Sequence, residues 1–154
     1  MELDTAYIET PLGIMRIVGN NDGVAFIDFI KEDQVVTTKE VPSSLTDAAK
    51  EMIEYFNGTR KEFTIRSIVK GTAFQEKVWS ELLKIKYGET ASYADIANRI
   101  GNPKAVRAVA NANARNPLSI VVPCHRIIGS NGKLTGYAGG LWRKEWLLDR
   151  EKNR

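Results

Sequence analysis

The sequence predicts an α+β fold, with a small N-terminal antiparallel sheet plus a helix and a mainly helical C-terminal domain that contains a helix-turn-helix. β-branched and aromatic runs, separated by glycine- and asparagine-rich turns, open the 154-residue chain. Helix-capping patterns followed by apolar residues at spacings of three and four dominate the rest. The composition changes near residues 67–71, so we expect domains at 1–66 and 71–154.

The N-terminal domain is expected to contain three strands and no chemically active motif. Ala6–Glu9, Ile14–Val18 and Val24–Phe29 are rich in residues that favour strands. The turn Gly19-Asn20-Asn21-Asp22-Gly23 joins the last two into a hairpin.

A helix is expected after these strands. Ser44-x-x-Asp47 resembles a capping box, and Asn57-Gly58 provides a helix end. The apolar residues between them recur at three and four: Leu45, Ala48, Ala49, Met52, Ile53 and Phe56.

The C-terminal domain opens with a second capping box, Thr72-x-x-Gln75. The helix behind it carries one apolar stripe, which we interpret as core: Phe74, Val78, Trp79, Leu82 and Leu83. A helix at the end of the chain, from Trp142 to Lys152, is expected to bury Trp146, Leu147 and Leu148.

Two short helices between these predict the helix-turn-helix. Ser92-x-x-Asp95 opens the first and Gly101 ends it, whereas Asn102 caps the second and Pro103 begins it. The second helix, to about Ala114, is slim and alanine-rich, which suits insertion into a DNA groove. Its expected DNA-binding residues are Ala105, Arg107, Ala108 and Asn111. An ordinary helical hairpin whose alanines allow close packing is the alternative.

The charge distribution indicates a polyanionic partner for the second half. Residues 1–70 carry 8 Lys and Arg against 12 Asp and Glu, a net −4, whereas residues 71–154 carry 14 against 7, a net +7. The first residues are acidic and no apolar run approaches a membrane span, so we expect a soluble, cytoplasmic monomer that binds no membrane.

Cys124 and His125 are the only cysteine and histidine of the chain, and they are neighbours. Leu118–Val122 is predicted to be a buried strand that ends at Pro123. In a continuing strand these two side chains would point to opposite faces, so contact needs a bend or a bridging water. The pair allows three interpretations at this point: a cysteine hydrolase, a metal site, or a DNA-binding module with an inert cysteine. One cysteine and one histidine are too few for a tetrahedral metal site.

Several motifs follow one another between residues 71 and 151. They are Ser92-Tyr93, Gly101-Asn102-Pro103, Arg107-Ala108-Val109, Asn116-Pro117, Pro123-Cys124-His125-Arg126, Gly136-Tyr137-Ala138-Gly139-Gly140 and Lys144-Glu145-Trp146-Leu147-Leu148-Asp149-Arg150-Glu151. In order and spacing they strongly resemble the O6-alkylguanine-DNA alkyltransferases. Residues 1–70 match only loosely, chiefly at Tyr55-Phe56-Asn57-Gly58.

The resemblance implies a repair protein with a ribonuclease H-like N-terminal domain, whose partner is double-stranded DNA containing O6-alkylguanine. The C-terminal domain would bind the minor groove and flip the damaged nucleotide into a pocket, because the alkyl carbon of a stacked base is out of reach of a buried sulfur. Arg107 would insert where the base departed. Tyr93 would assist rotation of the backbone and donate toward the base.

The resemblance also implies the chemistry. Cys124 would accept the alkyl group irreversibly, with His125 acting through a water as its base and Glu151 holding the imidazole. Residues alone do not favour Glu151 over Glu145 or Asp149. The alternative is a binding module for alkylated DNA without chemistry, which would need no thiol.

The resemblance assigns further residues around the thiol. Asn116 would brace the turn, and Tyr137 with the backbone amide of Ala138 would line the guanine pocket. The carbonyls of Cys124 and Ile127 would accept the exocyclic amine. Many members carry serine where Ala138 stands, so we expect altered pocket polarity. Because residues 1–70 contain no cysteine or histidine, we expect no zinc site there, and the family chemistry needs no cofactor.

Overall fold

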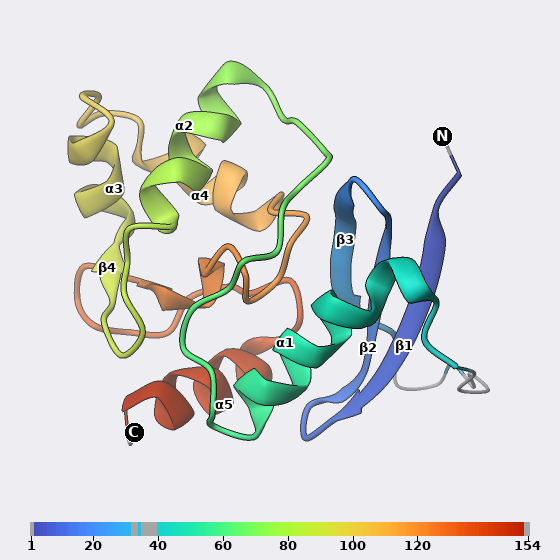
Figure 1. The fold of residues 1–154 in the computed structure, drawn as a ribbon. Helices are drawn as coiled ribbons and strands as arrows, with labels where there is room; N and C mark the ends of the chain where they lie inside the picture. Colours follow the sequence, from blue (N-terminus) through green and yellow to red (C-terminus); the bar gives the residue numbers. More distant parts are fainter. Residues whose placement is uncertain (1, 32–33, 35–39, 153–154) are drawn as a thin grey trace. The chain divides into compact units, whose positions relative to one another are not determined.

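The computed structural model describes residues 2–31, 34 and 40–152, which fall into two compact units, Met1–Val69 and Lys70–Arg154 (Figure 1). No helix in the described part of the chain is long and apolar enough to cross a bilayer.

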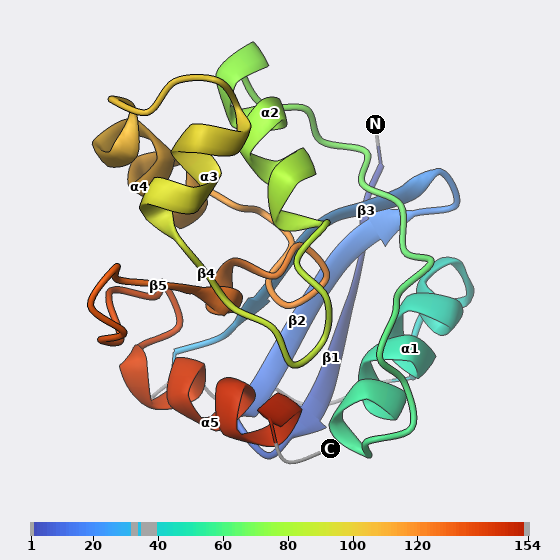
Figure 2. The same ribbon diagram turned by 90° about the vertical axis from the view of Figure 1, so that its left-hand side faces the viewer.

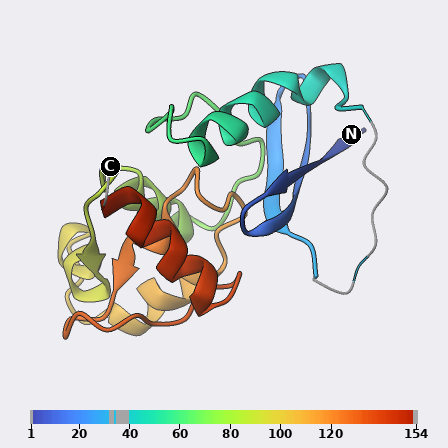
Figure 3. The same ribbon diagram turned by 90° about the horizontal axis from the view of Figure 1, so that it is seen from below.

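The first unit contains a three-stranded antiparallel sheet in the order β1-β2-β3, as predicted. The strands are β1 (Asp4–Thr10), β2 (Gly13–Asn20) and β3 (Gly23–Phe29). Alternate side chains of β1 and β2 are buried, β3 buries Val24, Ala25 and Ile27, and helix α1 (Thr46–Phe56) packs on the sheet (Figure 3). Period-two burial of this kind is what one covered sheet face requires.

The predicted capping box of α1 is wrong. A 3-10 turn, η1 (Ser43–Leu45), precedes the helix, and the N-cap is Leu45, which makes no side-chain capping bond. Ser44 lies inside η1, where its hydroxyl donates instead to Asp4 at the start of β1 (2.5 Å). Ile53, one of the recurring apolar residues of this helix, is 45% exposed. The predicted helix end at Asn57-Gly58 is confirmed.

The second unit is mainly helical. Its elements are α2 (Ala73–Leu82), β4 (Ala91–Ser92), α3 (Tyr93–Arg99), α4 (Val106–Ala114), η2 (Cys124–Arg126), β5 (Ile127–Ile128) and α5 (Leu141–Lys152). Helices α2, α3 and α4 pack on one another, and the short parallel pair β4-β5 lies between this group and α5 (Figures 1 and 2). The sequence did not indicate this strand pair, because two residues are too few for a periodic signal.

Both predicted capping boxes in this unit are confirmed, at Thr72 with Gln75 and at Ser92 with Asp95. Core predictions were only partly right. Leu83 is 58% exposed, and of the three α5 residues expected to be buried only Leu147 is fully so. Helix α5 instead buries charged side chains, namely Arg143, Lys144 and Glu151.

The predicted start of the second helix of the helix-turn-helix is also wrong. Helix α4 begins at Val106, three residues after Pro103. Asn102 donates its backbone N–H to Ala97, which with Gly101 at φ 79° closes α3 in a Schellman arrangement. Because Asn102 completes α3, it does not cap α4, and residues 102–105 form a turn.

Candidate active site

Cys124 follows a buried turn and not the predicted strand. The backbone reverses at Ile120, which has a φ of 73°, and the N–H of Val122 bonds back to Leu118. Asn116 holds this turn: its Nδ2 donates to the carbonyls of Leu118 (3.3 Å) and Val122 (2.8 Å), and its Oδ1 accepts from Leu118 N–H (3.0 Å). Apolar content alone could not separate a buried turn from a strand, since both are shielded from water.

The Cys124 thiol is buried, at 6% exposure, and opens the turn η2. Burial raises the pKa of this thiol, whereas the Asn116 side chain and the positive charge of Lys144 oppose the rise. The thiol is therefore mostly protonated near pH 7, and its reaction as a nucleophile requires a proton acceptor.

His125 is fully buried and is held by Glu151. The distance between His125 Nε2 and Glu151 Oε2 is 2.8 Å, and Arg126 Nε donates to Glu151 Oε1 at 2.7 Å. Burial lowers the pKa of His125 against the pull of Glu151. Although burial opposes it, the bonds and charges of His125 and Arg126 lower the pKa of Glu151 to about 2.

These charge states assign the tautomer of the ring. Glu151 is ionised and accepts, so the neutral imidazole carries its proton on Nε2. Nδ1 is buried and meets no hydrogen-bond partner among the described residues, which leaves it as the basic atom. The competing acids Glu145 and Asp149 are exposed on the same helix.

Sequence reasoning missed Lys144 and Thr135. Lys144 is fully buried, its Nζ donates to the Thr135 carbonyl at 3.1 Å, and burial lowers its pKa to about 8. The Thr135 hydroxyl lies 2.7 Å from that of Tyr93, the first residue of α3. A signal for Lys144 existed: it shares the buried face of α5 with Leu147 and Glu151, at spacings of three and seven.

The predicted pocket residues take different positions. The Tyr137 hydroxyl is buried, and burial followed by coulombic repulsion from Cys124 when that thiol is ionised raises its pKa well above the usual value, against the effect of the Ser119 side chain. Ala138 is exposed. Ile127 is buried in β5, and its N–H donates to the Cys124 carbonyl, which keeps a second lone pair.

The predicted DNA-binding residues lie on the outer side of α4. Arg107, Ala108 and Asn111 are exposed, and Ala105 at the N-cap is half-buried. On the inner side, Val109, Ala112 and Asn113 are buried, and the Trp79 indole donates to the Ala112 carbonyl at 2.9 Å. The indole therefore ties α4 to α2 and leaves the alanine-rich side free.

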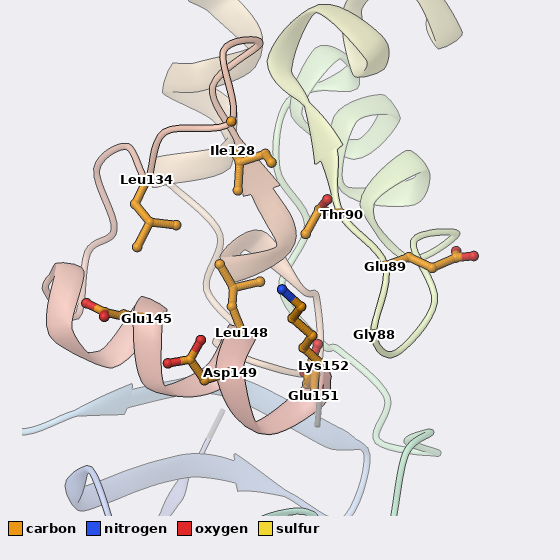
Figure 4. Close-up of a pocket in the computed structure, with 11 residues that line it drawn as sticks. Gly88, Glu89, Thr90, Ile128, Leu134, Glu145, Leu148, Asp149, Glu151 and Lys152 are labelled. Carbon is orange, nitrogen blue, oxygen red and sulfur yellow. The ribbon is translucent and has the colours of Figure 1, made fainter. Parts of the chain in front are cut away.

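A cavity of about 370 Å³ lies between α5, β5 and the loop before β4 (Figure 4). Acidic side chains from α5 and the loop, among them Glu89, Glu145 and Asp149, surround apolar ones such as Leu134 and Leu148. Glu151 is among its lining residues, whereas Cys124 and His125 are not. The cavity therefore lies beyond the carboxylate and not at the thiol.

Comparison with known proteins places both units in one class. A family model described as 6-O-methylguanine DNA methyltransferase, DNA binding domain, matches residues 73–153, and one described as the ribonuclease-like domain of the same family matches residues 4–66. Together they define a 6-O-methylguanine DNA methyltransferase in which a ribonuclease-like domain precedes a DNA-binding domain.

Whole-chain relatives agree with these matches. Methylated-DNA–protein-cysteine methyltransferase of Methanosarcina acetivorans is 46% identical over 95% of this chain and 96% of its own length. The constitutive enzyme of that name from Bacillus subtilis is 48% identical over 94% and 92%. The chain belongs to the 6-O-methylguanine DNA methyltransferase family.

Solved structures confirm the fold. The crystal structure of Mycobacterium tuberculosis O6-methylguanine methyltransferase matches with a TM-score of 0.88 and 40% identity, over 99% of this chain and 94% of that one. Mycobacterium tuberculosis OGT in complex with DNA matches with a TM-score of 0.87 and 41% identity, over 97% and 92%.

Proposed function

We propose that this chain repairs DNA by transferring an alkyl group, such as methyl, from O6 of guanine to its own Cys124 in a single irreversible turnover. One observation carries this proposal: the buried thiol is followed directly by a neutral imidazole that Glu151 holds with Nδ1 left basic. Membership of the methyltransferase family supports the same reaction.

The first step is binding to double-stranded DNA. The outer side of α4 offers Arg107 and Asn111 between small alanines, in the half of the chain with a net charge of +7. The helix enters the minor groove, Arg107 occupies the space of the departing base and Tyr93 assists rotation of the backbone. Extrusion brings the alkyl carbon to the sulfur, which a stacked base does not allow.

The second step is displacement at the alkyl carbon. His125 Nδ1 takes the thiol proton through a water, and the thiolate forms an S–C bond while the C–O6 bond breaks. The electron pair of the broken bond stays on the guanine, which takes up one proton, balancing the one that the thiol gave to His125, and remains in the DNA strand as the normal base. Lys144 stabilises the thiolate electrostatically, and Tyr93 donates toward the base. The thioether on Cys124 resists hydrolysis, so the protein acts once.

The pocket that receives the base is the next part of the proposal. Tyr137, the amide of Ala138 and the carbonyls of Cys124 and Ile127 line it. The buried hydroxyl of Tyr137 and its electrostatic coupling to the Cys124 sulfur support a role for this residue near the reacting atoms. All the residues named here belong to residues 71–154, so this domain performs both DNA binding and chemistry. Separately, we propose that the chain acts as a monomer.

A module that only binds alkylated DNA is the alternative, and the structure disfavours it. Such a module needs neither a thiol at position 124 nor a buried carboxylate that orients the neighbouring imidazole. We also place the chain in the cytoplasm, where a free thiol remains reduced.

Duplex DNA containing a single O6-methylguanine tests the function. Incubation is expected to add the mass of one methylene to the peptide bearing Cys124, because a methyl group replaces the thiol hydrogen, with one methyl transferred per protein. Peptide mass spectrometry after digestion measures this. Unmodified duplex of the same sequence is the control, and an unchanged peptide mass with the damaged duplex contradicts the proposal.

A further inference from the structure

Thr135 joins two helices of the candidate site through different atoms. Its hydroxyl lies 2.7 Å from the hydroxyl of Tyr93 in the first turn of α3, and its backbone carbonyl accepts from Lys144 of α5 at 3.1 Å. Lys144 is fully buried, and both Tyr93 and Thr135 are half-buried. The Tyr93 hydroxyl is therefore held in place before any base arrives.

The number of hydroxyl protons decides which of the two hydroxyls, that of Tyr93 or that of Thr135, donates the hydrogen bond between them. A phenol has one proton, and the proposed reaction uses that of Tyr93 as the donor toward the flipped guanine. Its oxygen is then an acceptor toward Thr135, so the Thr135 hydroxyl is the donor. A hydrogen bond accepted by the phenol oxygen strengthens the phenol as a donor, because linked hydrogen bonds polarise one another.

We infer that Thr135 is a positioning residue for alkyl transfer, which donates to Tyr93 and thereby directs the phenol proton toward the leaving guanine. The inference rests on the role proposed above for Tyr93. Thr135 touches neither the alkyl carbon nor the sulfur in this reaction, and its effect passes through the phenol. The bond from Lys144 reaches only the backbone carbonyl of Thr135. Substitution of the Thr135 side chain therefore removes the bond to Tyr93 and leaves the bond from Lys144.

Two substitutions of similar size separate the hydroxyl from packing. Thr135→Val keeps the shape and removes the hydroxyl, whereas Thr135→Ser keeps the hydroxyl and removes the methyl. At saturating duplex DNA with O6-methylguanine, Thr135→Val is expected to slow single-turnover transfer to Cys124 by about threefold to tenfold, the effect of one hydrogen bond. Thr135→Ser is expected to restore a rate close to that of the wild type.

The double variant tests whether the effect passes through Tyr93. In a Tyr93→Phe background, Thr135→Val is expected to cause no further slowing, because the acceptor oxygen is already absent. A further loss as large as in the wild type overturns the inference, as does a Thr135→Ser rate as low as that of Thr135→Val.

The remaining outcomes distinguish this inference from the function on which it rests. Normal transfer by Thr135→Val, with wild-type transfer intact, overturns only the assignment of Thr135. Absence of transfer by the wild type overturns the function and this inference together. Equal thermal midpoints for the valine and serine variants would show that a rate difference between them reflects the hydroxyl and not loss of folding.

Discussion

Glu151 illustrates how partners set the charge of a single residue. Its carboxylate is 2% exposed and joins His125 and Arg126, which come from a different segment of the chain. Its pKa of about 2 in the fold lies below the ordinary value of 4.5. A depressed carboxyl pKa means that ionisation stabilises the fold, fully above about pH 4.5, and that this contribution disappears as the pH falls through about 2.

Glu151→Gln is therefore expected to lower the free energy of unfolding by about 3 kcal/mol at pH 7, because Arg126 loses its buried counter-charge. The difference from the wild type should shrink between about pH 5 and pH 2, as the wild-type carboxylate becomes protonated. Denaturant titrations at several pH values measure it. Glu145→Gln, on the exposed side of α5, is the control, and a Glu151→Gln deficit that does not vary with pH would contradict this account.

At the scale of elements, the turn between α4 and η2 sets the position of the thiol. Strong capping signals predicted α2 and α3 correctly, because a cap and its partner lie three residues apart. The errors at Ser44, at Asn102 and along Leu118–Val122 have two other causes. Ser44 bonds to Asp4, which lies 40 residues away and outside any local pattern. Asn102 and Val122 bond back to Ala97 and Leu118, so these local segments form a helix end and a turn where the sequence pattern equally allowed a helix cap and a strand.

Asn116→Ala is expected to destabilise the protein by about 2 kcal/mol, because it leaves buried backbone groups of Leu118 and Val122 without their partner. Alkyl transfer should slow as well, since the backbone leading to Cys124 loses its brace. Thermal or denaturant unfolding and single-turnover kinetics measure the two effects. Asn111→Ala on the exposed side of α4 serves as the stability control, with an expected change below about 0.5 kcal/mol. Equal stability of the two variants would argue against the brace.

At the scale of the whole molecule, charge is divided along the chain. The net charge of −4 in residues 1–70 and +7 in residues 71–154 concentrates attraction for phosphates in the unit that carries the thiol. Association with DNA should therefore weaken as salt concentration rises, because binding releases counter-ions.

Arg107→Ala is expected to slow repair of duplex DNA while leaving the thiol reactive, because in the proposed mechanism the arginine fills the space that the flipped base leaves and does not contact the sulfur. The rate of transfer from duplex DNA measures repair, and the rate at which a small thiol reagent alkylates Cys124 measures the reactivity of the thiol. Lys84→Ala removes an exposed charge beyond α2 and is the matched control. Equal duplex repair by Arg107→Ala and the wild type would remove this role.

The sequence by itself determined the α+β class, the strands, two capped helices and the family, because these depend on local spacing and on motifs in a fixed order. Only the tertiary structure decided which acid holds His125, and that Thr135 contacts both Tyr93 and Lys144. The physical reason is distance along the chain: 26 residues separate His125 from Glu151, and 42 separate Tyr93 from Thr135. Folding alone brings such partners together, and their burial then sets the pKa values on which the chemistry depends.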